Sequence, residues 1–304
     1  MNHKETLENK ISSISKVLDI KKITEIHPDN NYIAKYYSLN EIPYTIFHTR
    51  TDFVHMGISK DGVYKEDDLL EAARIVQAYI ISTNAKHVLE LATGRGANSE
   101  YLGKLFPQTN FYGIDLTSDH ISYALKRARS LKNYHPRTGD YHDLSMYEDG
   151  SMEIVFVIEA ICHSTEKERV LSEVHRILKK DGLFIVIDGY RAKEAKNEAE
   201  EIAMKLVEKG MALEVFEQYP LFMDKALRAG FEIIKDEDLS QYILPNLRRF
   251  EKLAHKYFSH KFLAHFLNVF LPSKVINNAA AGYLMLDAAQ MGLFSYHLTV
   301  LKKK

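Results

Sequence analysis

Between residues 86 and 188, short apolar runs alternate with amphipathic stretches, and this alternation limits the possible folds more than any other feature. Strands separated by helices of about 10–15 residues are typical of β-α-β units, which build a parallel sheet with helices on both faces. The run Glu153–Glu159 is nearly all apolar, as expected of a strand covered on both sides. We therefore predict an α/β, Rossmann-like sheet of seven mostly parallel strands. The expected strands are 86–91, 110–115, 136–141, 153–159, 183–188, 231–235 and 296–301.

The chain on either side of this segment has mostly helical spacing of apolar residues. The expected helices there are 11–23, 67–82, 195–209, 219–229 and 247–271. Since the closing strands lie among them, we predict one α/β core with helical material before it and inserted before the last strand. The predicted divisions are an N-terminal lid at 1–65, the core at 66–240, a helical insertion at 241–292 and the last strand at 293–304.

The composition disfavours several other classes of protein. The chain has 40 basic and 41 acidic residues, whereas a nucleic-acid-binding protein usually has a basic excess. Its one cysteine, Cys162, rules out an internal disulfide and a thiolate metal cluster and suits a reducing compartment. The N-terminus lacks the apolar run of a secretory signal, and no run approaches the roughly 18 apolar residues of a membrane span. We expect a cytoplasmic protein without nucleic acid or metal, and a homodimer is compatible with the sequence.

Residues 88–98, VLELATGRGAN, form a glycine-rich turn between an expected strand and an expected helix. Small residues let a ligand approach the backbone, and the N-terminus of the helix offers free N–H groups. Asp115 ends the next expected strand, where its carboxylate can accept hydrogen bonds from both hydroxyls of a ribose. The pattern predicts a nucleoside-like ligand at the carboxyl edge of the sheet.

A dinucleotide-binding fold has a similar pattern, but three details favour another ligand. Ser99 stands where the dinucleotide fingerprint has its third glycine. Glu90 ends the first strand, where it would repel a pyrophosphate and suits an amino group. The segment Gly139-Asp140-Tyr141 offers a carboxylate and an aromatic face to an adenine. A dinucleotide-dependent oxidoreductase is therefore the alternative interpretation.

Several motifs follow one another in a known order. These are VLELATGRGANS, GIDLT, GDYHDLSMYEDGSMEIVFVIEA and RILKKDGLFIVIDGY, over about residues 85–190. In this order they resemble the motifs of class I S-adenosylmethionine-dependent methyltransferases. EAICHS at 159–164 is similar to the sterol, tocopherol and related small-molecule C-methyltransferase branch, and His55-Met56-Gly57 resembles its N-terminal lid. The resemblance implies S-adenosylmethionine as methyl donor and a small, fairly apolar acceptor (sterol-, prenyl- or quinone-like), with carbon slightly favoured over oxygen or nitrogen.

The resemblance also implies roles for individual residues. Gly94 and Gly96 would lie along the methionine part of the donor, Glu90 would orient its amino group, and Asp115 would bind its ribose. Ala92 stands where the family usually has glycine, and we expect it to be tolerated if its φ is negative. This departure leaves a non-catalytic, methyltransferase-like partner protein as a further alternative. The residues expected to hold the donor are Glu90, Ala92, Gly94, Gly96, Asp115, Leu116, Asp140, Tyr141 and Glu159.

Glu159 and His163 are the expected catalytic residues. Glu159 ends the fourth strand, at the sheet edge where ligands bind, and a histidine can take a proton near neutral pH. We expect Cys162 to pack rather than react. The acceptor pocket is expected to include Tyr37, His55, Phe250 and Tyr257, with further candidates among the N-terminal aromatic residues Tyr36, Tyr44, Phe47, His48 and Phe53.

The aromatic-rich stretch 247–271 has two interpretations. It is either helical core, or else part of an apolar acceptor pocket or a lid that touches lipid. In the second case its basic residues would face solvent or an anionic surface. These are Arg248, Arg249, Lys252, Lys256 and Lys261.

Overall fold

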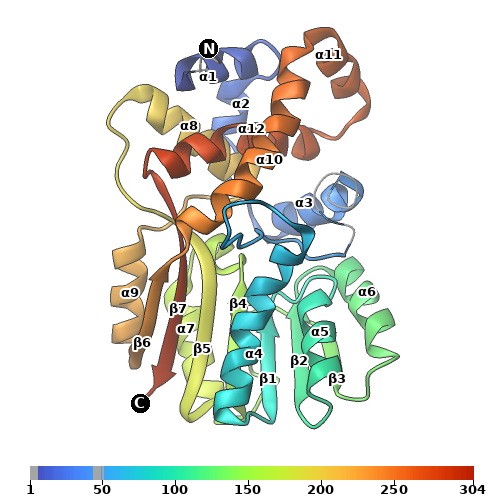
Figure 1. Ribbon diagram of the computed structural model, residues 1–304, viewed down its shortest axis with the longest axis vertical. Helices are drawn as coiled ribbons and strands as arrows, with labels where there is room; N and C mark the ends of the chain where they lie inside the picture. Colours follow the sequence, from blue (N-terminus) through green and yellow to red (C-terminus); the bar gives the residue numbers. More distant parts are fainter. Residues whose placement is uncertain (1–5, 44–48, 50) are drawn as a thin grey trace.

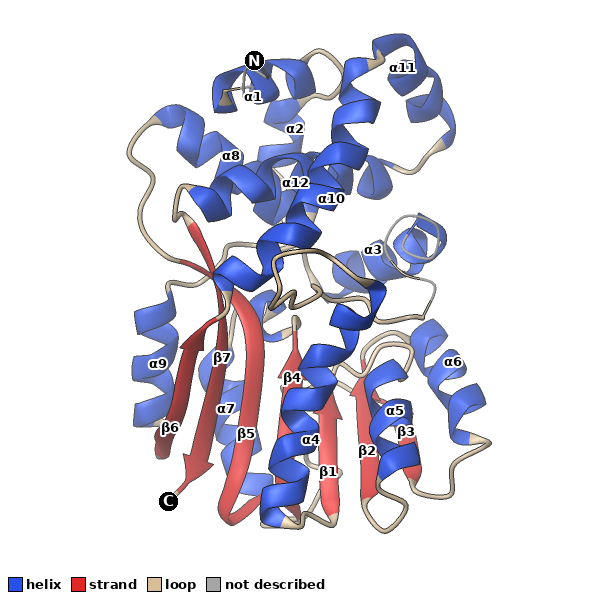
Figure 2. Ribbon diagram, in the orientation of Figure 1, coloured by secondary structure: helices blue, strands red, loops and turns tan. Residues whose placement is uncertain are grey.

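The predicted sheet is present in the computed structural model, which describes residues 6–43, 49 and 51–304. Within these residues seven strands form one sheet of order β3-β2-β1-β4-β5-β7-β6 (Figure 2). All neighbouring strands are parallel except the pairs that include β7. The strands are β1 (His87–Leu91), β2 (Asn110–Asp115), β3 (Tyr134–Thr138), β4 (Met152–Ile158), β5 (Leu178–Arg191), β6 (Phe231–Asp238) and β7 (Phe294–Lys303).

Helices cover both faces of the sheet because successive residues of each strand point to opposite sides. In β4, Ile154 and Phe156 pack on the side of α4 and α5, whereas Val155 and Val157 pack on the side of α7 and α9. The described helices are α1 (Leu7–Ser15), α2 (Ile20–Thr24), α3 (Asn30–Pro43), the 3₁₀ helix η2 (Glu66–Leu70), α4 (Glu71–Thr83), α5 (Ala97–Leu105), α6 (Ser118–Ala128), the 3₁₀ helix η3 (Ile161–His163), α7 (Lys167–Ile177), α8 (Glu198–Gly210), α9 (Tyr219–Arg228), α10 (Ser240–Ser259), α11 (Lys261–Phe270) and α12 (Ser273–Gln290). None of them is both long and apolar enough to cross a membrane.

A helical cap lies over the carboxyl ends of the parallel strands (Figure 1). It consists of α1, α2, α3, α8, α10, α11 and α12, and α12 contacts α8, α10, α3 and α1. One apolar cluster continues from the sheet into this cap, since it includes Val88 of β1 and Leu284 of α12. Helix α8 belongs to the stretch 66–240 that we predicted as core, yet it packs against the cap helices. The cap is therefore assembled from segments far apart in the chain.

Several predicted boundaries are wrong for local reasons. The helix expected at 11–23 is two helices, because Asp19 accepts a hydrogen bond from the Lys22 N–H and begins α2. The stretch 247–271 is also two helices, which meet at His260, whose φ of −112° and ψ of 72° are not helical. Strand β5 is longer than expected because β7 runs antiparallel beside it from Leu183 to Arg191.

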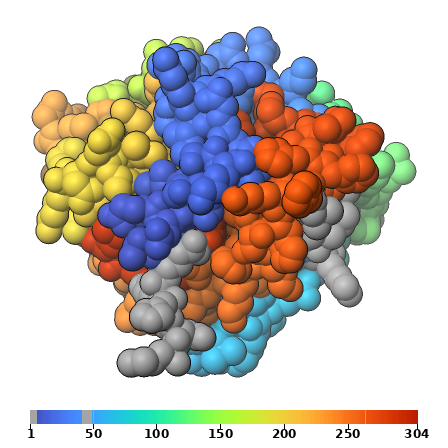
Figure 3. All heavy atoms as spheres, turned by 90° about the horizontal axis from the view of Figure 1, so that it is seen from above, coloured from blue at the N-terminus to red at the C-terminus, as the bar shows by residue number. Residues whose placement is uncertain are grey.

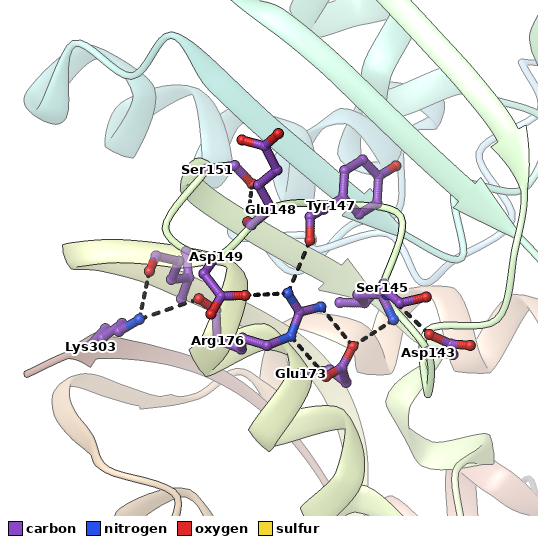
Figure 4. Close-up of polar contacts among 11 residues, drawn as sticks. Asp143, Ser145, Tyr147, Glu148, Asp149, Ser151, Glu173, Arg176 and Lys303 are labelled. Carbon is purple, nitrogen blue, oxygen red and sulfur yellow. Dashed lines mark hydrogen bonds and ion pairs between the residues drawn. The ribbon is translucent and has the colours of Figure 1, made fainter.

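The loop from β3 to β4 is anchored by one arginine of α7 (Figure 4). Arg176 donates hydrogen bonds to the Tyr147 carbonyl at 3.0 Å and to the Asp149 carboxylate at 2.7 Å. It also binds both oxygens of Glu173, and Glu173 accepts a hydrogen bond from the Leu144 N–H at 2.7 Å. These contacts hold the far end of the loop that carries Asp140 and Tyr141 into the site.

Candidate active site

The turn between β1 and α5 has three residues in the left-handed region. Their φ angles are 51° at Ala92, 54° at Gly94 and 81° at Gly96. A Cβ on Gly96 would lie 2.6 Å from the Tyr134 hydroxyl, whereas one on Gly94 would meet open space. The condition under which we expected alanine to be tolerated, a negative φ, is not met at Ala92, and alanine costs about 1 kcal/mol there because its Cβ crowds the backbone. The turn keeps its shape despite that cost.

Glu90 is buried at the end of β1 and is surrounded by hydrogen-bond donors. Its carboxylate accepts hydrogen bonds from the hydroxyls of Thr93 at 2.6 Å and Ser99 at 2.5 Å, and from the Asn98 amide at 3.1 Å. Burial raises the pKa of Glu90 to about 7. Ser99, which stands at the third glycine position of the dinucleotide fingerprint, thus donates a hydrogen bond to the Glu90 carboxylate.

Asp115 ends β2 with its carboxylate turned toward the glycine-rich turn. One oxygen accepts the Gly94 N–H at 2.9 Å, and the other accepts the Thr117 N–H at 2.8 Å. The Nδ1 atom of His120 lies 3.6 Å from this carboxylate. Asp115 therefore joins the first two strand ends and remains within reach of a ligand between them.

Asp140 and Tyr141 are held by neighbours on both sides. Asp140 accepts hydrogen bonds from the backbone N–H and the ring Nδ1 of His142, at 2.9 and 2.6 Å, and the contact with His142 lowers the pKa of Asp140. The other ring nitrogen of His142 lies 2.7 Å from the Ser164 hydroxyl. The Tyr141 hydroxyl donates to the Ala160 carbonyl at 3.1 Å. His142 was missed in the sequence, although its place directly after Asp140-Tyr141 could have indicated it.

Glu159 lies just beyond β4 with φ at 50°. One of its carboxylate oxygens accepts both the Met56 N–H at 2.5 Å and the Tyr296 hydroxyl at 2.7 Å. Burial raises the pKa of Glu159 to about 8. The side chain is thus held by the N-terminal segment and by β7, and its burial favours the protonated form.

His163 is held in one tautomer by its two partners. Its Nδ1 lies 3.3 Å from the Ala212 carbonyl, which can only accept, so Nδ1 carries the hydrogen. Its Nε2 then accepts a hydrogen bond from the Tyr37 hydroxyl at 2.8 Å. Burial lowers the pKa of His163 to about 4, and the ring is neutral near pH 7. His163 can take up a proton at Nε2 only when the Tyr37 hydroxyl no longer donates its hydrogen bond to that nitrogen.

Two cavities of different character meet at these residues. The smaller, of about 130 Å³, is bounded by strand-end loops, and we call it the donor cavity. The larger, of about 470 Å³, lies under the cap, and we call it the acceptor cavity. All the predicted donor residues line the smaller cavity except Gly96, and all four predicted acceptor residues line the larger one. The residues common to both are Tyr37, Val54, His55, Glu159 and His163.

The remaining N-terminal aromatic candidates divide between different places. Tyr36 lines the acceptor cavity. Phe53 packs in a small core cluster with Leu69 and Ala97. The other candidates, Tyr44, Phe47 and His48, lie outside the described residues.

Asp188 is a site residue that the sequence reasoning missed. It is buried and lines the acceptor cavity, and it accepts hydrogen bonds from the N–H groups of Gly189 at 2.7 Å and Cys162 at 3.1 Å. Burial raises its pKa. Its position one residue after Ile187, which pairs with Ile158 of β4, puts it beside Glu159 at the sheet edge. A strand-end acid on each of two neighbouring parallel strands was the available sequence signal.

The sheet order and the strand-end acids define a class I methyltransferase fold, and residues 82–229 match the family model described as a methyltransferase domain. The chain therefore contains a methyltransferase domain of the S-adenosylmethionine-dependent class. It is 32% identical over 115 residues to a demethylmenaquinone methyltransferase of Thermotoga maritima, a match that covers 38% of this chain and 48% of the relative. It is 30% identical over 96 residues to 24-methylenesterol C-methyltransferase 2 of Arabidopsis thaliana, over 31% of this chain and 27% of the relative.

The fold likeness extends over more of the chain than the sequence likeness. The solved structure of the [4+2]-cyclase SpnF has a TM-score of 0.74 at 18% identity, and the alignment covers 91% of this chain and 97% of that one. The chain spans about half, or less, of the length of the curated relatives it matches. These comparisons confirm the predicted class and its resemblance to small-molecule methyltransferases.

Proposed function

We propose that the protein transfers a methyl group from S-adenosylmethionine to a small, fairly apolar acceptor. The observation that carries the proposal is the meeting of two unlike cavities at Glu159 and His163. One has the carboxylates and open backbone that a nucleoside with an amino group requires. The other is lined mostly by apolar side chains and suits a hydrophobic molecule.

The described residues fit the donor at three points. Asp115 suits the ribose hydroxyls, Asp140 and Tyr141 suit the adenine, and Glu90 suits the amino group. The open space beside Gly94 leaves room for a ligand against the backbone. The donor supplies a methyl group already activated on a positively charged sulfur. A cation bound between Glu90 and Glu159 would favour the ionised form of both acids, whose pKa values burial has raised.

The chain's own part in the reaction is alignment of the acceptor and exclusion of water. Residues Tyr37, Phe250, Tyr257 and Tyr296 give the acceptor cavity aromatic walls. A carbon acceptor becomes a cation when it gains the methyl group, and each aromatic face can stabilise it by about 0.5–2 kcal/mol. Glu159 and Asp188, both at the cavity, are then placed to accept the proton that the cation loses. This arrangement supports carbon over oxygen or nitrogen as the methylated atom.

The acceptor class follows from the same cavity. The names of two relatives contain a quinone precursor and a sterol, and molecules of these kinds fit the apolar lining and the size of the cavity. We also propose a cytoplasmic location, which the buried thiol of Cys162 supports. A homodimer and the lack of nucleic-acid binding stay predictions from the sequence.

A thermal melt tests the donor first. At 100 times its dissociation constant, S-adenosylhomocysteine should stabilise the protein by about 2.7 kcal/mol and raise Tm by roughly 5–10 °C. NAD and NADP at equal concentration should leave Tm unchanged, and transfer of labelled methyl to quinone, prenyl and sterol acceptors should follow. A Tm shift with the dinucleotides alone would overturn the proposal in favour of an oxidoreductase. Donor binding without turnover on any acceptor would favour a non-catalytic partner protein.

A further inference from the structure

Helix α11 has one side toward the acceptor cavity and the other toward solvent. Leu267, and Leu271 directly after the helix, line the cavity. The helix stands at the outer corner of the cap, far from the sheet (Figure 1). A group of exposed aromatic residues marks an interaction surface. Removing one phenylalanine side chain from water stabilises the bound state by about 1.5–3 kcal/mol. The solvent side carries Phe262 (96% exposed), Phe266 (61%), Val269 (78%) and Phe270 (69%).

The chain beside this apolar side is strongly basic. Residues 248–274 contain six lysines and arginines and one acid, although the whole chain has a net charge of −1. That acid, Glu251, is ion-paired with Lys10 of α1. Arg248, Lys252 and Lys256 recur every four residues along α10, so they share one face of it. These three side chains line a groove of about 540 Å³.

The basic groove and the acceptor cavity adjoin each other. Leu253 and Lys256 of α10 line both of them. The top view shows α10 and α11 together on the outer face of the cap (Figure 3). An apolar helix side, a basic helix face and one wall of an apolar cavity therefore lie at one corner, which we call the α10–α11 corner.

We propose that the α10–α11 corner binds the surface of an anionic phospholipid bilayer. The phenylalanines of α11 enter the boundary between headgroups and acyl chains, and the cations of α10 face the anionic headgroups. Apolar side chains flanked by lysine and arginine are typical of helices that lie in this interface. A second copy of the chain fits less well, because a symmetric contact would bring two basic faces together. If the proposed function holds, an apolar acceptor passes from the bilayer into the cavity along α11.

Sedimentation with vesicles tests the proposal without requiring methyl transfer. The full chain should bind phosphatidylcholine vesicles that contain about 30% phosphatidylglycerol, and bind pure phosphatidylcholine weakly. The double variant F262S/F266S should weaken binding about tenfold or more, because two interfacial aromatic residues are lost. The double variant R248Q/K252Q should weaken it about fivefold for each charge removed, and added salt should do the same.

Matched controls separate this surface from general effects of the substitutions. Leu125→Ser removes an apolar side chain of α6 that is 50% exposed, and Lys205→Gln removes a cation of α8. Both should leave vesicle binding unchanged, and all variants should keep the wild-type Tm within about 2 °C. Wild-type protein that stays in the supernatant with anionic vesicles would overturn the proposal. So would a dimer in solution that F262S/F266S dissociates, because a second copy would then cover the helix.

Discussion

The donor cavity and the acceptor cavity share a wall but are built in different ways. The donor cavity comes mostly from strand ends between residues 90 and 163 and from their loops, with further lining from α3 and residues 52–55. The acceptor cavity adds side chains of α10, α12 and β7, more than 200 residues after those of α3. Its lining is mostly apolar, whereas the donor cavity combines apolar residues with the carboxylates of Glu90, Asp115 and Asp140. The contrast teaches that recognition of the donor depends mainly on neighbouring strand ends, whereas that of the acceptor depends on how distant helices pack.

The largest expected effect is the loss of donor binding when Asp115 of the donor cavity is replaced. Asp115→Ala removes the carboxylate that accepts the Gly94 and Thr117 N–H groups and that suits the ribose hydroxyls. The Kd for S-adenosylhomocysteine, measured by calorimetry, should rise about 100-fold or more, since charged hydrogen bonds contribute roughly 1.5–3 kcal/mol each. Asp143→Ala in the next loop is the control and should leave the Kd unchanged. A Kd for Asp115→Ala near that of wild type would mean that the ribose lies elsewhere.

A substitution in the wall that the two cavities share should reduce turnover and leave donor binding nearly unchanged. Glu159→Gln retains an acceptor for the Met56 N–H and the Tyr296 hydroxyl but cannot become negatively charged. The single-turnover rate of methyl transfer should fall by about 10–100-fold, while the donor Kd changes by only a few fold. Glu166→Gln, on an exposed acid near η3, serves as the matched control. An unchanged rate would show that Glu159 only holds Met56 and Tyr296 in place.

A substitution in α12 should affect the acceptor cavity alone. Gly282 lines this cavity, and a Cβ there would meet Phe250 at an ordinary 3.7 Å. Gly282→Leu should therefore fold, with a gain of about 0.8 kcal/mol from helix propensity, while its side chain narrows the cavity. The KM for the acceptor should rise about tenfold, with the donor Kd unchanged. If the Kd for the donor rose as much as the KM for the acceptor, the two cavities would not bind their ligands independently.

The raised pKa values of Glu90 and Glu159 predict how stability depends on pH. At pH 6.5 the unfolded glutamates are ionised, whereas the folded protein still holds protons on these two and loses them through pKa values of about 7 and about 8 as the pH rises to 8.5. Stability is therefore lost as the pH rises through this window, and Tm should fall by about 2–5 °C. The lowered pKa of His163, about 4, acts in the opposite direction but only below about pH 6.5. Glu159→Gln should flatten the slope, and an equally steep slope in that variant would contradict the assignment.

The smallest expected effect is a change in Tm when Ala92, which departs from the family motif, is replaced by glycine. Ala92→Gly should relieve the left-handed strain at φ 51° and raise Tm by about 2 °C. Ala199→Gly in α8 is the reverse control, because glycine inside a helix costs about 0.5–1 kcal/mol. A lower Tm for Ala92→Gly, measured in the same scan, would mean that the methyl group of Ala92 contributes packing that outweighs the strain.

The sheet and the donor cavity were predictable because their signals are local. The strand before the turn, the glycines 94 and 96, and Asp115 at the next strand end are set by neighbouring residues and by the common direction of parallel strands. Phe250 and Tyr257 could be proposed for the acceptor cavity only from the aromatic-rich composition of the stretch 247–271. The bend at His260, which separates α10 from α11, had no comparable sequence signal and was missed.

The sequence by itself therefore determined the fold class, the donor class and the acids Glu90, Asp115 and Glu159 at the sheet edge. Only the tertiary structure decided the state of those acids and the form of the acceptor cavity. Burial raises the pKa of Glu159, whereas the hydrogen bonds from Met56 and Tyr296, which are 240 residues apart, lower it. His163 has one tautomer because α8 ends close enough for the Ala212 carbonyl to reach it. Burial and hydrogen bonding set a pKa, and both depend on contacts between residues that the sequence does not place side by side.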